Sequence, residues 1–442
     1  MKKISLTLIG LYLLFLHGFS QVTEHYTSIF QAKPLKLEEI NLVTSYYSQT
    51  GSHSAVTGGG DLKLNGTIIK GSGSEQLTDF ANMLELKLVG YSETGIKHTI
   101  LAGLGVDHHT AASQKWISST GASSPEGNRV YPSLNWTAEN ENKGTEFGLG
   151  TYYSHEYNYT SFALDGHYGF KNKTGGEFSG KVSAYFDQVK LIYPSELIPA
   201  TATTSINPYD INVITTNASR SSGGSGGGGG VVNPVTGGYS EPSIPTSPRH
   251  TYTGSLTYSQ VINKSAQFSL LLDIVKQDGW LGLPFHRVFF TNGTEAIENL
   301  PHSRLKIPIG ARFNYFIGDD VIVRTYYRFY TDDWGLVSHT ASIELPYKLT
   351  PFFSISPFYR FYTQTATKYF APMGMHAASE TFFTSNYSSS AFTSNYFGLG
   401  LRTAPPGGIN QTYLSALELR YGHYAQSTDL NSNVISLHFT LK

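Results

Sequence analysis

Hydrophobic and polar residues alternate one by one along several stretches of the chain, most clearly between residues 305 and 364. In 307–316, Ile309 and Phe313 fall on one face and Arg312 on the other. A period of two places successive side chains on opposite faces of a β-strand. The polar face here carries charges in mid-strand, and the apolar face runs into aromatic residues at its ends. Lipid outside, a wet lumen inside and aromatic girdles at both interfaces are typical of a transmembrane β-barrel.

The same alternation predicts an all-β, antiparallel, up-and-down barrel of 16 strands over residues 38–442. Short connections alternate with long ones, as periplasmic turns and extracellular loops do in outer-membrane barrels. A count of 14 is the alternative if one weak hairpin lies outside the wall. The predicted strands are 38–48, 78–90, 96–107, 128–139, 145–154, 158–170, 178–190, 250–261, 266–277, 305–316, 321–330, 337–347, 352–364, 392–403, 413–424 and 433–442.

The first 20 residues have the composition of a secretion signal. Lys2 and Lys3 precede an apolar run, and small residues precede a predicted cut after Ser20. We expect residues 1–20 to be removed and residues 21–37 to form a periplasmic lead-in. The mature protein is then expected in the outer membrane of a Gram-negative cell.

Composition narrows the class further. Aromatic residues make up 14% of the chain and charged residues only 14%, whereas soluble domains carry roughly 25% charged residues. The absence of cysteine excludes a disulfide framework and a thiolate site. The balance of 31 basic and 32 acidic residues gives no electrostatic case for nucleic acid. We therefore expect outer-membrane lipid and the barrel-assembly machinery as partners, no nucleic acid and no cofactor.

The connection 191–249 is the main low-complexity segment. Its stretch 221–230 reads S-S-G-G-S-G-G-G-G-G, a flexible linker composition. No Gly-Lys-Ser/Thr follows, so a phosphate-binding loop is not indicated. We expect a long flexible extracellular loop.

Four charged residues on three consecutive predicted strands share the lumenal face by parity: Arg324, Arg328, Glu344 and Arg360. One interpretation is that they pair and stiffen the wall, since charges inside proteins are usually paired. The other is a basic constriction that selects anions, as charged rings do in pores. The sequence leaves both open.

A second constellation, Asp332, Asp333, Trp334, Gly335 and His339, surrounds a predicted tight turn at the outer rim. It suits turn chemistry, in which Asp caps the turn, Gly takes positive φ and Trp lies at the lipid headgroups. Asp and His could also activate water in a rim hydrolase. Parity places His339 on the lipid-facing side, which argues against a dyad.

A third segment, Asp107, His108 and His109, could bind a metal through imidazole and carboxylate groups. Adjacent residues of a strand point to opposite faces, so the two His residues cannot chelate jointly while the strand persists. We therefore predict no metal site.

Residues 327–335 (Y-R-F-Y-T-D-D-W-G), His339-Thr340 and residues 360–364 (R-F-Y-T-Q) resemble a family of outer-membrane proteins known only as a domain of unknown function. Gly105 to Thr110 resembles another stretch of that family, and the likeness runs from about residue 36 to the C-terminus. The resemblance implies a barrel. It also implies periplasmic redox proteins as partners, because genes of the family lie beside genes for flavin attachment and thioredoxin-like proteins.

These observations predict a passive channel or transport component that is not an enzyme. The lumen of a 16-strand barrel is wide enough for water. The alternative is a barrel whose lumen is plugged by its own long loops and which binds periplasmic flavin or thioredoxin-like proteins. A rim hydrolase that uses Asp332, Asp333 and His339 is the third hypothesis.

Overall fold

The computed structural model describes residues 32–53, 62–64, 67–69, 75–110, 126–191, 245–284 and 286–442. The predicted signal peptide, residues 21–31 and most of the connection 191–249 lie outside the described residues. Among the described residues, no helix is long and apolar enough to cross a membrane.

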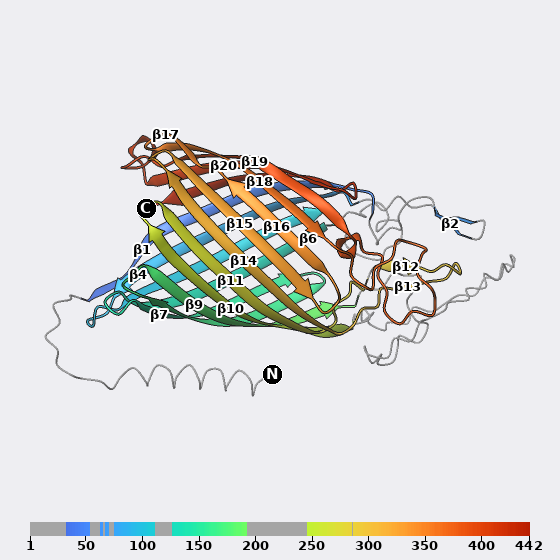
Figure 1. Ribbon diagram of the computed structural model, residues 1–442. Coiled ribbons are helices and arrows are strands. Elements are labelled where there is room, and N and C mark those ends of the chain that lie inside the picture. Colours follow the sequence, from blue (N-terminus) through green and yellow to red (C-terminus); the bar gives the residue numbers. More distant parts are fainter. Residues whose placement is uncertain are drawn as a thin grey trace, which may run out of the picture.

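Sixteen antiparallel strands close into a single barrel, which confirms the predicted fold class and the higher of the two strand counts (Figure 1). The first strand pairs with the last, so the sheet has no open edge. Short elements β16 and β17 together form one wall strand, because both pair with β15 and β18 on either side. The wall consists of β1 (Lys33–Thr50), β4 (Leu77–Tyr91), β5 (Lys97–Thr110), β6 (Glu126–Asn140), β7 (Thr145–Glu156), β8 (Tyr159–Lys171), β9 (Gly176–Lys190), β10 (Thr246–Asn263), β11 (Ala266–Gly279), β14 (Ser303–Ile317), β15 (Val321–Asp332), β16 (Val337–Glu344), β17 (Tyr347–Thr350), β18 (Phe353–Gln364), β19 (Phe392–Thr403), β20 (Leu414–Gln426) and β21 (Asn431–Leu441).

The period of two in the sequence becomes an inner and an outer face of this wall. On β7, for example, Phe147, Leu149 and Tyr153 are exposed on the outer surface, whereas Ser154, which follows Tyr153, is buried on the inner one. An apolar outer surface and a polar inner surface suit a cylinder that has lipid outside and water inside. The barrel therefore displays its apolar side chains outward, the reverse of a soluble domain.

The longest connections all leave the same end of the barrel, here called the loop end: 51–76, 111–125, 191–245, 280–302 and 365–391. The N-terminal end of β1 and the C-terminus lie at the opposite end, here called the turn end (Figure 1). The lead-in prediction is wrong at its boundary, because β1 already begins at Lys33. A register shift between Leu37 and Glu39 lets these early residues keep pairing with β4.

Two connections at the loop end fold together into what we call the loop cap, residues 286–302 and 365–391. It contains strands β12 (Arg287–Phe289) and β13 (Glu295–Ile297), which pair with each other, and the 3-10 turn η2 (Tyr387–Ser389). Val288, Phe290 and Phe383 form its buried core. The two segments are joined by isolated bridges, one of which links Phe290 with His376. Figure 1 shows β12 and β13 beyond the end of the barrel wall.

The remaining described elements are small. Strands β2 (Leu62–Leu64) and β3 (Thr67–Ile69) pair within the β1–β4 connection. A second 3-10 turn, η3 (Ile409–Gln411), lies in the β19–β20 connection at the turn end. The candidate residues named from the sequence lie on the barrel wall or in the turn after β15, next to the loop cap.

Candidate functional site

The lumenal face from β14 to β20 carries a series of arginines. Odd-numbered residues of β15 and β18 such as Tyr327 and Tyr359 are exposed on the outer surface. The even-numbered residues between them consequently face the lumen. The four charged residues predicted to face inward all lie on this face: Arg324 and Arg328 on β15, Glu344 on β16 and Arg360 on β18.

The structure brings Glu344 together with Arg324, but its shorter contact is with a residue that sequence reasoning missed. Arg324 Nη1 lies 3.7 Å from Glu344 Oε2, and the two residues are register partners. Arg420 on β20 donates a hydrogen bond to Glu344 Oε1 over 3.0 Å and another of 3.0 Å to Glu418. Arg402 on β19 lies 4.0 Å from the same Glu418. Glu344 is thus part of a chain of ion pairs rather than the centre of the predicted foursome.

Arg360 on β18 and Arg312 on β14 bind no carboxylate among the described residues. Arg360 stacks on Tyr396, with 4.9 Å between the guanidinium carbon and the ring centre. Arg312 lies 5.6 Å from the ring centre of Tyr326 in the same way. Within the described part of the chain, no carboxylate reaches ion-pair distance of either guanidinium. Their charge is balanced only by the weaker attraction of an aromatic face.

Arg328 does not join this network. It pairs in register with Thr340, nearer the loop end than Arg324. Its Nε is buried and has no hydrogen-bond partner among the described residues. Of the four predicted residues, the structure therefore pairs only Arg324 with Glu344, whereas Arg360 lies over an aromatic ring and Arg328 lies apart.

We call five lumenal residues on β14, β15, β18, β19 and β20 the arginine stripe. Two lumenal carboxylates, Glu344 and Glu418, lie among them. The same parity rule applied to the strands predicted at 305–316, 392–403 and 413–424 could have found the members that were missed. The members are Arg312, Arg324, Arg360, Arg402 and Arg420.

The interior around the stripe is accessible to water. The side chains of Arg324 and Arg402 point into the barrel and are nevertheless 51% and 53% exposed. A lumen packed with protein would bury them, because close-packed interiors leave few voids larger than a water molecule. Both residues lie within four positions of the turn end of their strands, so solvent enters the lumen from that end as far as Arg324.

The opposite wall, from β5 to β10, is electrostatically different. Three of its lumenal basic side chains lie beside aspartates on the neighbouring strand, so that their charge is compensated locally. The pairs are Arg129 with Asp107 at 3.8 Å, Lys181 with Asp165 at 3.0 Å and Arg249 with Asp187 at 3.1 Å. The excess of positive charge is thus confined to one side of the lumen.

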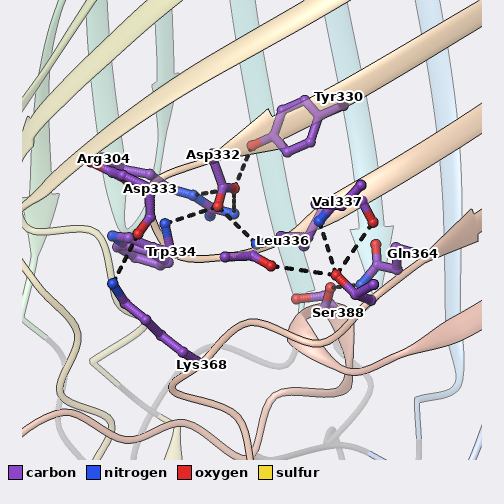
Figure 2. A network of polar contacts seen from close by, with 12 residues as sticks. Arg304, Tyr330, Asp332, Asp333, Trp334, Leu336, Val337, Gln364, Lys368 and Ser388 are labelled. Carbon is purple, nitrogen blue, oxygen red and sulfur yellow. Dashed lines mark hydrogen bonds and ion pairs between the residues drawn. The ribbon is translucent and has the colours of Figure 1, made fainter.

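At the loop end of β15, Asp332 is the centre of a hydrogen-bonded turn (Figure 2). Its carboxylate is 0% exposed and pairs with Arg304 on β14, whose Nε donates over 3.0 Å. Tyr330 Oη donates to the same carboxylate over 2.7 Å. The backbone N–H groups of Trp334 and Leu336 donate over 3.0 and 3.1 Å. Asp332 thus caps the turn, as the turn-chemistry interpretation predicted.

Gly335 takes φ of +85°, as that interpretation also required. Its expectation for Trp334 was wrong: the indole is 3% exposed and does not lie at the lipid surface. It lies between Arg304, whose guanidinium carbon is 4.3 Å from the indole ring centre, and the ring of Tyr369 in the loop cap. Its Nε1 donates to the carbonyl of Ser303. The loop cap covers Trp334, and the alternation of residues along a strand cannot predict that a distant loop folds over it.

The same turn holds the loop cap to the wall (Figure 2). Lys368 donates from its backbone N–H to the carbonyl of Trp334 and from Nζ to the carbonyl of Asp333. Gln364 at the end of β18 donates to the carbonyl of Ser388 over 3.0 Å. The two family stretches noted in the sequence thus meet at the base of one loop.

The residues of the hypothetical rim hydrolase are not assembled. Asp332 points inward, and its carboxylate is saturated by the donors described above. His339 lies on the outer face, where its Nδ1 is 2.7 Å from Tyr327 Oη. The two side chains are therefore on opposite sides of the wall and cannot share a proton.

The Asp107-His108-His109 segment also behaves as strand parity predicted. Asp107 faces inward and accepts a hydrogen bond from Tyr131 Oη over 2.8 Å. His109 lies 3.3 Å from Glu156 on the same face, whereas His108 contacts Asn128 on the other. In the part of the chain that the structure describes, no three His, Cys, Asp or Glu residues are placed to hold a metal ion.

The closed wall, its apolar outer surface and its charged, wet interior define an outer-membrane β-barrel. The chain belongs to the family described as "Protein of unknown function (DUF3570)", whose model matches residues 38–431. No curated protein matches it.

Among solved structures, the chain is similar to Pseudomonas aeruginosa OccK5 (OpdH), with 9% identity, coverage of 91% of this chain and 97% of that one, and a TM-score of 0.39. It is also similar to Vibrio cholerae OmpT, with 9% identity, 93% and 99% coverage and a TM-score of 0.35. For the COG4313 outer membrane channel from Pseudomonas putida F1 the values are 10% identity, 74% and 98% coverage and a TM-score of 0.33. These values are too low to transfer a property of those proteins to this chain.

Proposed function

We propose that this protein is a passive outer-membrane channel that favours small anionic solutes. The observation that carries the proposal is the arginine stripe: five guanidinium groups on one side of a wet lumen, with two carboxylates among them. Charged groups that line a water-filled passage set the sign of the ions that enter it. An unbalanced lumenal field also raises the local concentration of the oppositely charged solute.

The half-exposed side chains of Arg324 and Arg402 favour a channel over a plugged barrel. The loop cap is connected to β11, β14, β18 and β19, and the ring of its Tyr387 lies 4.1 Å from that of His53 after β1. Within the described residues, the cap therefore reaches from β11 around to the segment that follows β1. The predicted periplasmic redox partners stay a prediction, since no contact within the described residues bears on them.

The test is solute flux into proteoliposomes that contain the full mature protein. A triple variant, R324Q/R360Q/R402Q, removes three stripe charges and leaves the hydrogen-bonded Arg420 in place. We expect the flux of acetate relative to acetamide, a neutral solute of the same size, to fall several-fold, because the field that concentrates anions is weakened.

The matched control is Lys181→Gln, which removes one lumenal positive charge from the opposite wall. It should lower the relative acetate flux much less than any single stripe substitution. Equal loss in K181Q and in R360Q would contradict a stripe-based selection, and so would an unchanged flux ratio in the triple variant.

A further inference from the structure

A pocket of about 340 Å³ opens in the lumen wall within the arginine stripe. Arg312, Arg324 and Arg360 line it together with Tyr326 and Tyr396. Its volume is at the lower end of the range of small-molecule sites, roughly 300–1,000 Å³. It is thus large enough for a small metabolite and too small for a folded partner.

The strand register explains how the pocket forms. Arg312, Tyr326, Ser342, Arg360 and Tyr396 are successive register partners across β14, β15, β16, β18 and β19. Each Arg is followed on the next strand by the Tyr over which it stacks. The short side chain of Ser342 in the middle leaves the space open. The two guanidinium groups are thereby held at either side of a depression.

The positive charge of this pocket is poorly compensated. Arg312 and Arg324 are diagonal neighbours on adjacent strands, an arrangement in which like charges repel. One carboxylate, Glu344, also lines the pocket, but it lies 3.7 Å from Arg324 and accepts a hydrogen bond over 3.0 Å from Arg420, a fourth lining arginine. Arg312 and Arg360 bind no carboxylate among the described residues. A bound anion would relieve this repulsion.

The stacked arrangement also suits a particular shape of anion. Stacking on tyrosine orients each guanidinium plane and leaves N–H donors free at its edge. Arginine binds planar carboxylates through two parallel N–H donors. Arg312 and Arg360 are separated by Tyr326 and Ser342 across two strands, a spacing that suits two carboxylates on one extended molecule, each met by one guanidinium group.

We propose that this pocket is a binding site for a small dicarboxylate, with Arg312 and Arg360 each holding one carboxylate and Arg324 adding charge between them. The proposal rests on the proposed anion-selective function and specifies its solute class. Binding at such a site would concentrate the dianion within the lumen, and release would require only exchange with bulk anions.

The experiment is calorimetric titration of the purified full-length mature barrel in detergent, with succinate as the probe and acetate as the single-carboxylate comparison. We expect succinate to bind more tightly than acetate. R312Q and R360Q should each weaken succinate binding about tenfold or more, because each loses a charge-assisted pair of hydrogen bonds.

Arg402→Gln is the matched control, since Arg402 belongs to the stripe but not to the pocket lining. It should leave the succinate affinity nearly unchanged. Arg312→Lys keeps the charge and loses the planar fork, so its affinity should fall between those of wild type and R312Q. Heat-modifiable migration of each variant on detergent gels verifies that it is folded.

Equal affinities for succinate and acetate would overturn the proposal, and so would an equal loss of affinity in R402Q and R360Q. Absence of succinate binding to a folded protein that still conducts anions selectively would remove this site and leave the proposed channel function intact. Tight, R360-dependent succinate binding without anion-selective flux would instead support the site and refute the channel proposal.

Discussion

Asp332 at the loop end of β15 and Glu344 in the ion pairs of the arginine stripe are two lumenal carboxylates that differ in burial. Asp332→Asn and Glu344→Gln make the same chemical change, from carboxylate to amide. The Asp332 side chain is 0% exposed and its partner Arg304 is 17% exposed. Glu344 is 22% exposed, and its partners Arg324 and Arg420 are 51% and 36% exposed. The free energy lost on each change should follow that difference.

For Asp332, removing the charge leaves Arg304 desolvated and without its counter-ion. Breaking a buried pair from one side costs about 3–5 kcal/mol. The Asn side-chain oxygen can still accept from the backbone N–H groups of Trp334 and Leu336, so we expect a loss near the lower limit, about 3 kcal/mol. For Glu344, water reaches the partner guanidinium, and we expect a loss of about 1 kcal/mol.

The assay is equilibrium unfolding in urea, in detergent or lipid, of the wild type and both variants. Asp333→Asn serves as the control, because Asp333 is exposed and only its backbone groups are bonded to neighbours. Its stability should lie within about 0.5 kcal/mol of the wild type. A D332N variant no less stable than E344Q would refute the argument that burial of the Asp332–Arg304 pair holds this rim together.

Three further outcomes are expected. The mature barrel should migrate faster on detergent gels before boiling than after, because a sheet closed by β1 and β21 resists unfolding; identical migration would count against closure. Deleting residues 221–230 should leave this shift intact, since loop-closure cost changes slowly with length; loss of the shift would contradict a dispensable loop. Burial acts to raise the pKa of Glu380 in the loop cap, but hydrogen bonds from Ala377 N–H and from His376 lower it below the ordinary 4.5. The stabilisation from Glu380 is therefore complete above about pH 4.5 and is lost as the pH falls through its lower pKa in the folded protein. Pepsin cleavage within 365–391 should then rise more steeply on acidification in the wild type than in E380Q. Parallel pH profiles of the two proteins would contradict this.

Sequence alternation predicted the wall well because every strand is in contact with lipid on one side and water on the other. The inward positions of Arg324, Arg328, Glu344 and Arg360 follow from parity alone. So does the separation of His108 from His109. The alternation of apolar and polar residues therefore predicts both the barrel fold and the face on which each wall side chain lies.

The contacts among those side chains could not be predicted in the same way. Glu344 and Arg420 are 76 residues apart and meet only because two intervening strands place them across a curved wall. Trp334 is buried because the connection 365–391 folds back over it, and Tyr369 supplies the covering ring. Neither the curvature of a closed sheet nor the path of a long loop has a periodic signature.

The family stretches gain a physical role from the same contacts. Tyr330, Asp332 and Trp334 build the rim turn, and Gln364 ties η2 to the end of β18. These residues hold the loop cap against the wall, whereas the arginine stripe lies deeper in the lumen. The residues that anchor the loop cap are thus distinct from the arginines proposed to select solutes.

The most direct test of the central claim is the reversal potential of the wild-type protein in a planar lipid bilayer under a KCl gradient. An anion-favouring lumen predicts stable conductance whose reversal potential is displaced toward the equilibrium potential of chloride. Displacement toward the potassium potential, or the absence of any conductance from correctly folded barrels, would contradict it.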